Sequence, residues 1–148
     1  MNDPRGVLDT NVIMAAKRSP TPSSPGYELL DRCRRGQWQL LYSTDILLEY
    51  AEKLSGLGQT RGWVVEVIAL LAALGEDVEI RYFHLPKYPV DADDTAFLLC
   101  ASNGRATHLA TYDRHLLELK EFYAGQFEID RPLQLLHAVR SRTGLPEA

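Results

Sequence analysis

Short apolar runs alternate along the chain with longer segments in which apolar residues recur every three or four positions. The short runs predict buried strands, and the longer period predicts helices with one buried face. The predicted strands cover residues 5–9, 38–42, 78–83, 108–111 and 127–129. The predicted helices cover residues 11–17, 27–35, 44–54, 60–74, 91–102, 114–119 and 131–140. This alternation predicts a three-layer α/β domain built on a parallel sheet.

Residues with strong preferences for helix ends mark several of these boundaries. Gly36, Gly75 and the Asn103-Gly104 pair are stop signals, and Ser43 or Thr44 can cap the helix that follows. Pro132 stands at the first turn of the last helix, a position that proline favours. Residues 18–26 hold three prolines and three serines and are predicted to form a loop, either a cover for a nearby site or a plain surface connection. The tail from Ser141 onward is expected to be loosely ordered.

The composition is that of a single globular domain, expected to span residues 1–148 with a core over about 5–137. The chain has 148 residues, of which 45% are hydrophobic and 24% charged. Residues 63–74 form the longest apolar run and are too few to cross a bilayer, and no secretory signal opens the chain. Cys33 and Cys100 lack a CxxC spacing and are expected to be buried, reduced thiols. These features predict a cytoplasmic protein without a membrane partner.

The net charge argues mildly against a nucleic-acid partner. The chain carries 16 basic and 20 acidic residues, a formal charge of −4. Proteins that bind phosphate groups usually show a basic excess. Because the distribution of charge can override the total, nucleic acid is not excluded.

Acidic residues follow each of the first four predicted strands. In chain order they are Asp9, Glu49, the group Asp91, Asp93 and Asp94, and Asp113. The carboxyl ends of parallel strands share one edge of a sheet, and open α/β sheets bind their ligands at that edge. We therefore expect these carboxylates to lie close together.

Each acid also has a purely structural explanation. Asp9 could cap the first helix, and the group from Asp91 to Asp94 could combine a cap with first-turn acids that the helix dipole favours. Glu49 could pair with Lys53 one turn later, and Asp113 could be a turn residue. These explanations treat the acids separately and do not account for their recurrence at one edge.

Several carboxylates in one place favour a divalent cation. Two unit charges ~4 Å apart repel each other by about 4 kcal/mol at an effective dielectric constant near 20. Oxygen ligands without cysteine select Mg²⁺ or Mn²⁺ over zinc, and the four histidines are scattered along the chain. Magnesium held by carboxylates acts most often on phosphate groups.

Four segments together resemble the PIN-domain ribonucleases in content, order and spacing. They are Val7–Val12, Glu49 after a capped helix start, Asp91–Leu98, and Thr111–Leu117. The resemblance extends over about residues 5–137. The Asp-x-Asp-Asp form of the third segment is similar to the branch that contains toxin components of toxin–antitoxin pairs.

The resemblance implies a fold, an activity and partners. It implies an α/β/α PIN-like fold with a central five-stranded parallel sheet of order 3-2-1-4-5. It also implies cleavage of single-stranded RNA by an endonuclease that needs Mg²⁺ or Mn²⁺. Toxins of this kind commonly form homodimers and are silenced by a small antitoxin protein that covers the acidic site.

The site residues are carried over by position. Asp9, Glu49, Asp94 and Asp113 match the family's four acids, and Thr10, Asn11 and Thr111 match polar residues that hold the site. Asp94 is preferred to Asp91 or Asp93 because it precedes the apolar positions of its helix at the family's spacing. Asp91 is expected to cap that helix, or to serve as an extra outer acid of the metal site. The candidates for phosphate contact, each alternatively a solvated surface charge, are Lys17, Arg18, Arg114 and His115.

In this interpretation, Asp9 and Asp94 hold the metal, Glu49 orients or deprotonates the attacking water, and Asp113 adds an outer or second-metal contact. The product would carry a 5′-phosphate. One alternative is a PIN-like RNA- or protein-binding module with a degenerate site, because Tyr112 could crowd the fourth acid. Another is a haloacid-dehalogenase-like phosphatase, although that family needs a second acid where Asn11 stands.

Overall fold

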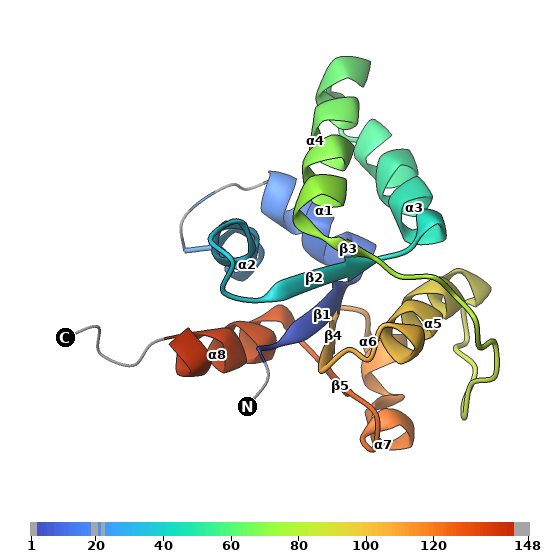
Figure 1. Ribbon diagram of the computed structural model, residues 1–148. Helices are drawn as coiled ribbons and strands as arrows, with labels where there is room; N and C mark the ends of the chain where they lie inside the picture. The colour runs from blue at the N-terminus through green and yellow to red at the C-terminus, as the bar shows by residue number, and fades with distance from the viewer. Residues whose placement is uncertain (1–2, 19–20, 22, 144–148) are drawn as a thin grey trace.

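The computed structural model describes residues 3–18, 21 and 23–143, and a single parallel sheet lies at its centre (Figure 1). The sheet has five strands in the order β3-β2-β1-β4-β5, and every neighbouring pair is parallel, which confirms the predicted fold. The strands are β1 (Arg5–Leu8), β2 (Gln39–Tyr42), β3 (Glu76–Asp77), β4 (His108–Ala110) and β5 (Glu128–Asp130).

Helices connect consecutive strands and cover the sheet. They are α1 (Thr10–Arg18), α2 (Pro25–Arg34), α3 (Thr44–Ser55), α4 (Arg61–Leu74), the 3-10 turn η1 (Ala92–Asp94), α5 (Thr95–Asn103), α6 (Arg114–Leu117), α7 (Lys120–Tyr123) and α8 (Pro132–Thr143). α5 packs on β1, β2 and β4, while α8 packs on β4, β5 and α2 on the other side of the sheet (Figure 1). The central strands are therefore buried on both faces. For that reason their sequences are almost continuously apolar, with Val7, Leu8, Leu40, Leu41 and Leu109 all fully buried.

Local sequence signals set most helix ends. The Ser43 hydroxyl accepts the N–H of Ile46 and caps α3, and the Thr60 hydroxyl caps α4 in the same way. Gly36 follows α2 with a φ of +77°, a left-handed conformation that glycine adopts without strain. Residues 19, 20 and 22 of the predicted loop lie outside the described residues.

The predicted third strand over residues 78–83 is wrong: β3 lies two residues earlier, and the following residues form a coil. β2 ends at Tyr42 because Ser43 already caps the next helix, so a longer β3 would have no partner. The last bond of this ladder runs from the Val78 N–H to the Tyr42 carbonyl at 2.7 Å. The acids from Asp91 onward therefore do not follow a strand directly.

The C-terminal part differs from the prediction in two further places. The predicted helix over residues 114–119 is α6, which already ends at Leu117, and a second short helix that was not predicted, α7, follows at Lys120–Tyr123. α8 continues through Thr143, so the prediction of a loose tail from Ser141 is wrong for these residues, and residues 144–148 lie outside the described part. Cys33 and Cys100 are buried and free, as predicted. No helix within the described residues is long and apolar enough to cross a membrane.

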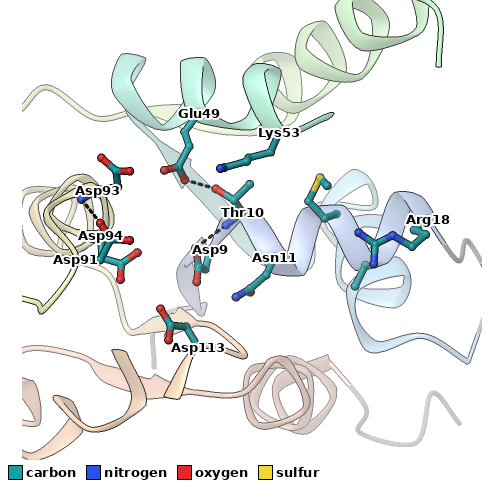
Figure 2. Close-up of a pocket in the computed structure, with 12 residues that line it drawn as sticks. Asp9, Thr10, Asn11, Arg18, Glu49, Lys53, Asp91, Asp93, Asp94 and Asp113 are labelled. Carbon is teal, nitrogen blue, oxygen red and sulfur yellow. Dashed lines mark hydrogen bonds between the residues drawn. The ribbon is translucent and has the colours of Figure 1, made fainter. Parts of the chain in front are cut away.

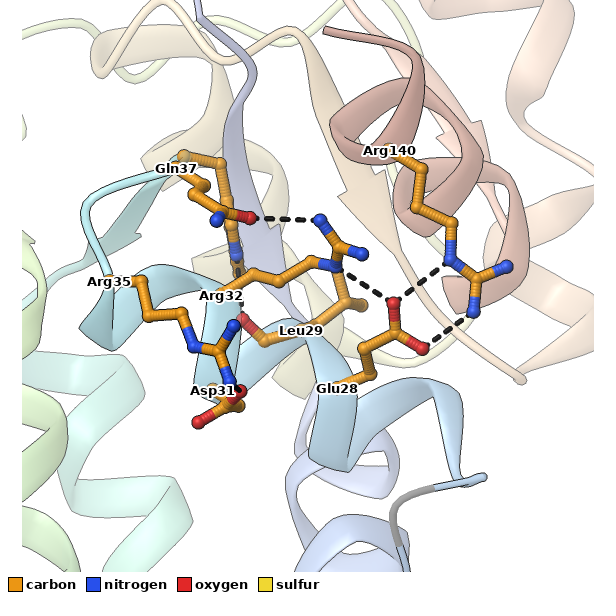
Figure 3. A network of polar contacts seen from close by, with 8 residues as sticks. Glu28, Leu29, Asp31, Arg32, Arg35, Gln37 and Arg140 are labelled. Atoms are coloured by element: carbon orange, nitrogen blue, oxygen red, sulfur yellow. Dashed lines mark hydrogen bonds and ion pairs between the residues drawn. The ribbon is translucent and has the colours of Figure 1, made fainter. Parts of the chain in front are cut away.

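An ion-pair network joins α2 to α8 (Figure 3). The carboxylate of Glu28 accepts bonds from Arg32 Nε at 2.8 Å and from Arg140 at 2.9 and 2.5 Å. These hydrogen bonds, above all those from Arg140, lower the pKa of Glu28 to about 2. The network therefore fixes the C-terminal helix against the layer that carries α1.

We expect Glu28→Gln to lower the melting temperature at pH 7 by about 3 °C, which corresponds to about 1 kcal/mol for a partly exposed pair. The folded-state pKa lies below the ordinary value of 4.5, so the stabilisation is present above pH 4.5 and disappears as the pH falls toward 2. The difference between the two proteins should shrink over that range in thermal melts followed by circular dichroism. Glu121→Gln, at an exposed carboxylate of α7, is the control, and an equal loss there would contradict the prediction.

Candidate active site

The junction between β1 and α1 places Asp9 at the carboxyl edge of the sheet. Asp9 is 5% exposed and is held by three bonds. Its Oδ1 accepts the N–H of Thr10 at 2.7 Å, its Oδ2 accepts the hydroxyl of Thr111 at 2.6 Å, and its own N–H donates to the Ala110 carbonyl at 2.9 Å. The carboxylate is thus fixed between β1 and β4 before any ligand arrives.

Glu49 approaches Asp9 from the neighbouring helix α3. The Thr10 hydroxyl donates a hydrogen bond to Glu49 Oε2, which ties α3 to the start of α1 (Figure 2). Tyr50, the next residue, is fully buried and donates its hydroxyl to the carbonyl of Leu8. The cap at Ser43 and the buried Tyr50 therefore set the position of Glu49 on the helix.

The group of acids before α5 divides into different roles. Asp91 caps η1 by accepting the N–H of Asp93 at 2.9 Å, as expected. Asp94 stands at the start of α5, but its side chain makes no capping bond. It is 8% exposed, and its Oδ2 is a buried oxygen with no hydrogen-bond partner. A buried polar atom without a partner is costly, so the position of Asp94 is not explained by folding alone.

Thr111 connects the first and the fourth acid. It is fully buried at the end of β4, and its Oγ1 accepts the N–H of Asp113 at 2.9 Å while donating to Asp9. Asp113 in turn caps α6 by accepting the N–H of His115 at 2.9 Å.

Tyr112 is 40% exposed, and its N–H donates to Asn11 Oδ1 at 3.3 Å. The Tyr112 ring does not line the cavity described next.

These side chains surround one cavity of about 360 Å³ at the carboxyl edge of the sheet (Figure 2). In Figure 2, Asp9, Asp94 and Asp113 point toward a common space, with Glu49 above them. The lining residues are Asp9, Thr10, Asn11, Met14, Ala15, Arg18, Glu49, Lys53, Asp91, Asp93, Asp94 and Asp113. The structure thus brings together all four acids predicted from the sequence.

Two carboxyls of the cavity, those of Asp9 and Asp94, hold their protons far more tightly than exposed ones do. Burial raises the pKa of Asp9 to about 6, although the hydrogen bonds from Thr111 and Thr10 act to lower it. Burial, followed by the negative charges of Asp9, Asp113 and Asp91, raises the pKa of Asp94 to about 7. At neutral pH the cavity therefore concentrates negative charge that a cation would relieve.

The donor set fits a hard divalent ion. All the candidate ligands are carboxylate oxygens, and the unpartnered Oδ2 of Asp94 is a ligand that no protein group uses. Among the described residues, no three Asp, Glu, His or Cys side chains stand close enough to enclose an ion as they are. Mg²⁺ usually keeps several of its waters and needs only one or two carboxylates, so this spacing suits an ion that is partly bound through water.

The cations predicted to contact phosphate are placed differently from one another. Arg18 lines the cavity, but Lys17 faces a separate groove between α1, α2 and α4. Arg114 is 83% exposed in its side chain and pairs with Glu118 at 3.6 Å. Arg114 and His115 follow Asp113 directly in the chain but do not line the cavity, so Arg18 alone of these four predicted cations does.

Lys53 lines the cavity instead, and the sequence interpretation considered it only as a partner for Glu49. No ion pair between these two residues is formed; Glu49 is bonded to Thr10. The spacing of four residues from Glu49 on one helix was the signal that could have placed Lys53 in the site.

A family model for the PIN domain matches residues 5–115. This match covers the junction at Asp9, α3 with Glu49, the acids before α5, and Asp113. The chain belongs to the PIN domain family. PIN domains are generally nucleases and typically use divalent metals, and the match gives no support to the phosphatase alternative.

The fold of this PIN domain is also seen in a solved structure described as FitAB bound to an IR36 DNA fragment. The two chains are 20% identical, with a TM-score of 0.52, and the comparison covers 86% of this chain and 94% of the other. At this identity the likeness shows the fold alone. No curated protein matches the chain.

Proposed function

We propose that this PIN domain is a Mg²⁺- or Mn²⁺-dependent endoribonuclease that hydrolyses phosphodiester bonds of single-stranded RNA. The observation that carries the proposal is the buried carboxylate of Asp94, whose Oδ2 has no protein partner and which shares the cavity with Asp9, Glu49 and Asp113. Carboxylates of this kind suit a hard cation, and carboxylate-bound magnesium acts mostly on phosphates. The choice of single-stranded RNA rests on the resemblance to PIN-domain ribonucleases.

Asp9 and Asp94 would hold the metal ion, with Asp113, and Asp91 at the rim, as outer carboxylates. When bound, a divalent ion neutralises these carboxylates and stabilises the negative charge that develops on the phosphate. Thr111 and the Thr10 N–H keep Asp9 in place while this happens. Their hydrogen bonds also limit the rise of the Asp9 pKa, so the carboxylate can lose its proton near neutral pH.

Glu49 would orient the attacking water and accept its proton. The Thr10 hydroxyl occupies Oε2 of Glu49, which leaves Oε1 to face the water. The water oxygen attacks phosphorus, the bond from phosphorus to the 3′-oxygen breaks, and that oxygen takes up a proton. The products are a 3′-hydroxyl and a 5′-phosphate. Arg18, Lys53 and the amide of Asn11, all at the cavity wall, would contact the neighbouring phosphates.

We also propose that the protein acts as the toxin of a toxin–antitoxin pair, with a small antitoxin protein as its partner. The Asp-x-Asp-Asp form of residues 91–94 supports this role, because it is similar to that of such toxins. A short reading frame next to this one that encodes a DNA-binding protein would support the pairing. Co-expression with that protein should then suppress cleavage.

The activity is tested with end-labelled single-stranded RNA, matched single-stranded DNA and duplex RNA, each with Mg²⁺, with Mn²⁺ or with excess chelator. We expect metal-dependent internal cuts in the single-stranded RNA that leave 5′-phosphates, and none with Asp9→Asn. Glu121→Gln, outside the cavity, should cleave as the wild type does. Equal cleavage in excess chelator or by Asp9→Asn would overturn the proposal, and calorimetry without Mn²⁺ binding at millimolar metal would favour a binding module instead.

A further inference from the structure

Residues 81–90, here called the aromatic segment, form a coil that leads directly into the acidic cavity. The segment runs beside α5 (yellow-green to yellow in Figure 1) and is followed directly by Asp91, which lines the cavity. Its first residues contact Asn103 at the far end of α5. It therefore extends along the nine residues of that helix, or about 14 Å.

The aromatic side chains of this segment face solvent although its backbone is anchored. Tyr82, Phe83 and Tyr88 are 75%, 65% and 57% exposed. None of these three rings contacts another aromatic ring among the residues that the structure describes. Exposed apolar side chains that are grouped in one segment mark a binding surface more often than a single exposed residue does.

The backbone is fixed by side chains from two helices. The Oδ1 of Asn103 accepts the N–H groups of Arg81 and Tyr82 at 2.8 and 2.9 Å, and its Nδ2 donates to the Tyr82 carbonyl at 2.9 Å. Near the other end, the Tyr123 hydroxyl donates to the Lys87 carbonyl at 2.6 Å, and Leu85 is buried between these anchors. The rings are thus presented on an ordered support, which lowers the entropy cost of binding.

The charge of the segment is opposite to that of the cavity. It contains Arg81 and Lys87, both exposed, and no acidic residue between Glu79 and Asp91. Arg81 pairs with Glu79 at 2.9 Å, and Lys87 Nζ lies 5.4 Å from the centre of the Phe122 ring. In a chain of net charge −4, this is a local basic stretch interleaved with aromatic rings.

We propose that the aromatic segment binds the single-stranded RNA substrate by stacking its bases on Tyr82, Phe83 and Tyr88 while Arg81 and Lys87 contact phosphates. The proposal rests on the proposed function. A cavity lined by carboxylates repels phosphates, so contacts outside it have to add to those of Arg18 and Lys53 at its wall. Aromatic rings combined with basic side chains are the usual means by which proteins hold single strands without base pairing. The exposed Lys87 favours a partner that carries phosphates over a second copy of this chain, since lysine is depleted at the centre of protein interfaces.

Binding is measured by fluorescence anisotropy in excess chelator, so that no cleavage interferes. The probes are a labelled single-stranded oligouridylate of 12 nucleotides and an abasic strand of the same length, which keeps the phosphates but lacks bases. We expect Tyr82→Ala, Phe83→Ala and Tyr88→Ala each to weaken oligouridylate binding about tenfold, and the abasic strand to be affected little. Arg81→Gln and Lys87→Gln should weaken both probes and reduce the salt dependence of binding.

Tyr27→Ala is the matched control, because Tyr27 is an exposed tyrosine on α2 away from the segment. All the variants should keep their melting temperatures within about 2 °C, since the changed rings are exposed. Unchanged oligouridylate binding in the three aromatic variants would overturn the proposal. So would a change in sedimentation without a change in RNA binding, because the surface would then join two copies of the chain. Ring-dependent binding without cleavage in Mn²⁺ would instead contradict the proposed catalytic function alone.

Discussion

Asp94→Asn is expected to remove most of the RNA cleavage and, without metal, to make the protein more stable. The side chain is buried, its Oδ2 has no partner, and the charges of Asp9, Asp113 and Asp91 surround it. Asparagine has nearly the same shape but removes one charge from this group. At pH 8 we expect the melting temperature in excess chelator to rise by about 3 °C, or about 1 kcal/mol.

The same substitution removes a proposed metal ligand. We expect cleavage to fall about a thousandfold, which corresponds to about 4 kcal/mol of transition-state stabilisation. The gain in melting temperature on adding Mn²⁺ should also disappear. Activity and stability thus change in opposite directions, a result that a merely misfolded variant cannot produce.

Asp93→Asn is the control for stability, because Asp93 is the exposed neighbour and loses the same charge. Its melting temperature should change by less than about 1 °C. The advantage of Asp94→Asn should vanish at pH 5, where the pKa of about 7 keeps the Asp94 carboxyl protonated in the wild type. A lower melting temperature for Asp94→Asn at pH 8 would contradict the interpretation of Asp94 as a carboxylate placed for a ligand.

The metal-free protein is expected to lose stability as the pH rises from about 4 to about 7. The folded-state pKa values of Asp9 and Asp94 are about 6 and about 7, above the ordinary value of 3.8. The folded state therefore holds these protons more tightly than the unfolded chain does, and stability decreases as they are released. For Asp9 alone the rise corresponds to about 3 kcal/mol between the two limits.

Other carboxyls act in the opposite sense at lower pH. The pKa values of Glu28, Asp31, Glu76 and Glu128 lie below their ordinary values because arginine or lysine side chains donate hydrogen bonds to them, so their contribution is lost below about pH 4.5. The metal-free protein should therefore be most stable between about pH 4 and 5. A divalent ion that replaces the protons of the cavity should move this optimum above pH 7.

Thermal melts from pH 4 to 8.5, in chelator and in Mn²⁺, test this expectation. We expect the melting temperature in chelator to fall by about 5–10 °C between pH 5 and 8, and the fall to be small in Mn²⁺. Calorimetry in buffers of different ionisation enthalpy should show proton release when Mn²⁺ binds. A melting temperature that rises steadily from pH 5 to 8 in chelator would show that the cavity carboxyls are not the dominant titrating groups.

The sequence was sufficient for the order of strands and helices and for the edge at which the acids gather. Local properties of the sequence include the apolar strands at Val7 and Leu109 and the helix-end signals at Ser43, Thr60 and Gly36. They depend only on residues close in the chain and not on how distant elements pack. The acids follow from the same reasoning, because the carboxyl ends of parallel strands share an edge.

The register of β3 was decided by its neighbour. Residues 78–83 alternate like a strand, but β2 ends at Tyr42, and the N–H groups of Arg81 and Tyr82 are satisfied by Asn103, which is more than twenty residues away. No local pattern contains this information. The early end of β3 also leaves the aromatic segment as an exposed coil beside α5.

The tertiary structure alone decided the different environments of Asp94 and Asp91. It also decided that Lys53 lines the cavity and that Lys17 faces a separate groove. Sequence determines which residues share a helix face or a strand end, because that depends on local geometry. Burial, the raised pKa values and the orphaned oxygen depend on which elements pack together across the sheet, and they arise from contacts distant in the chain.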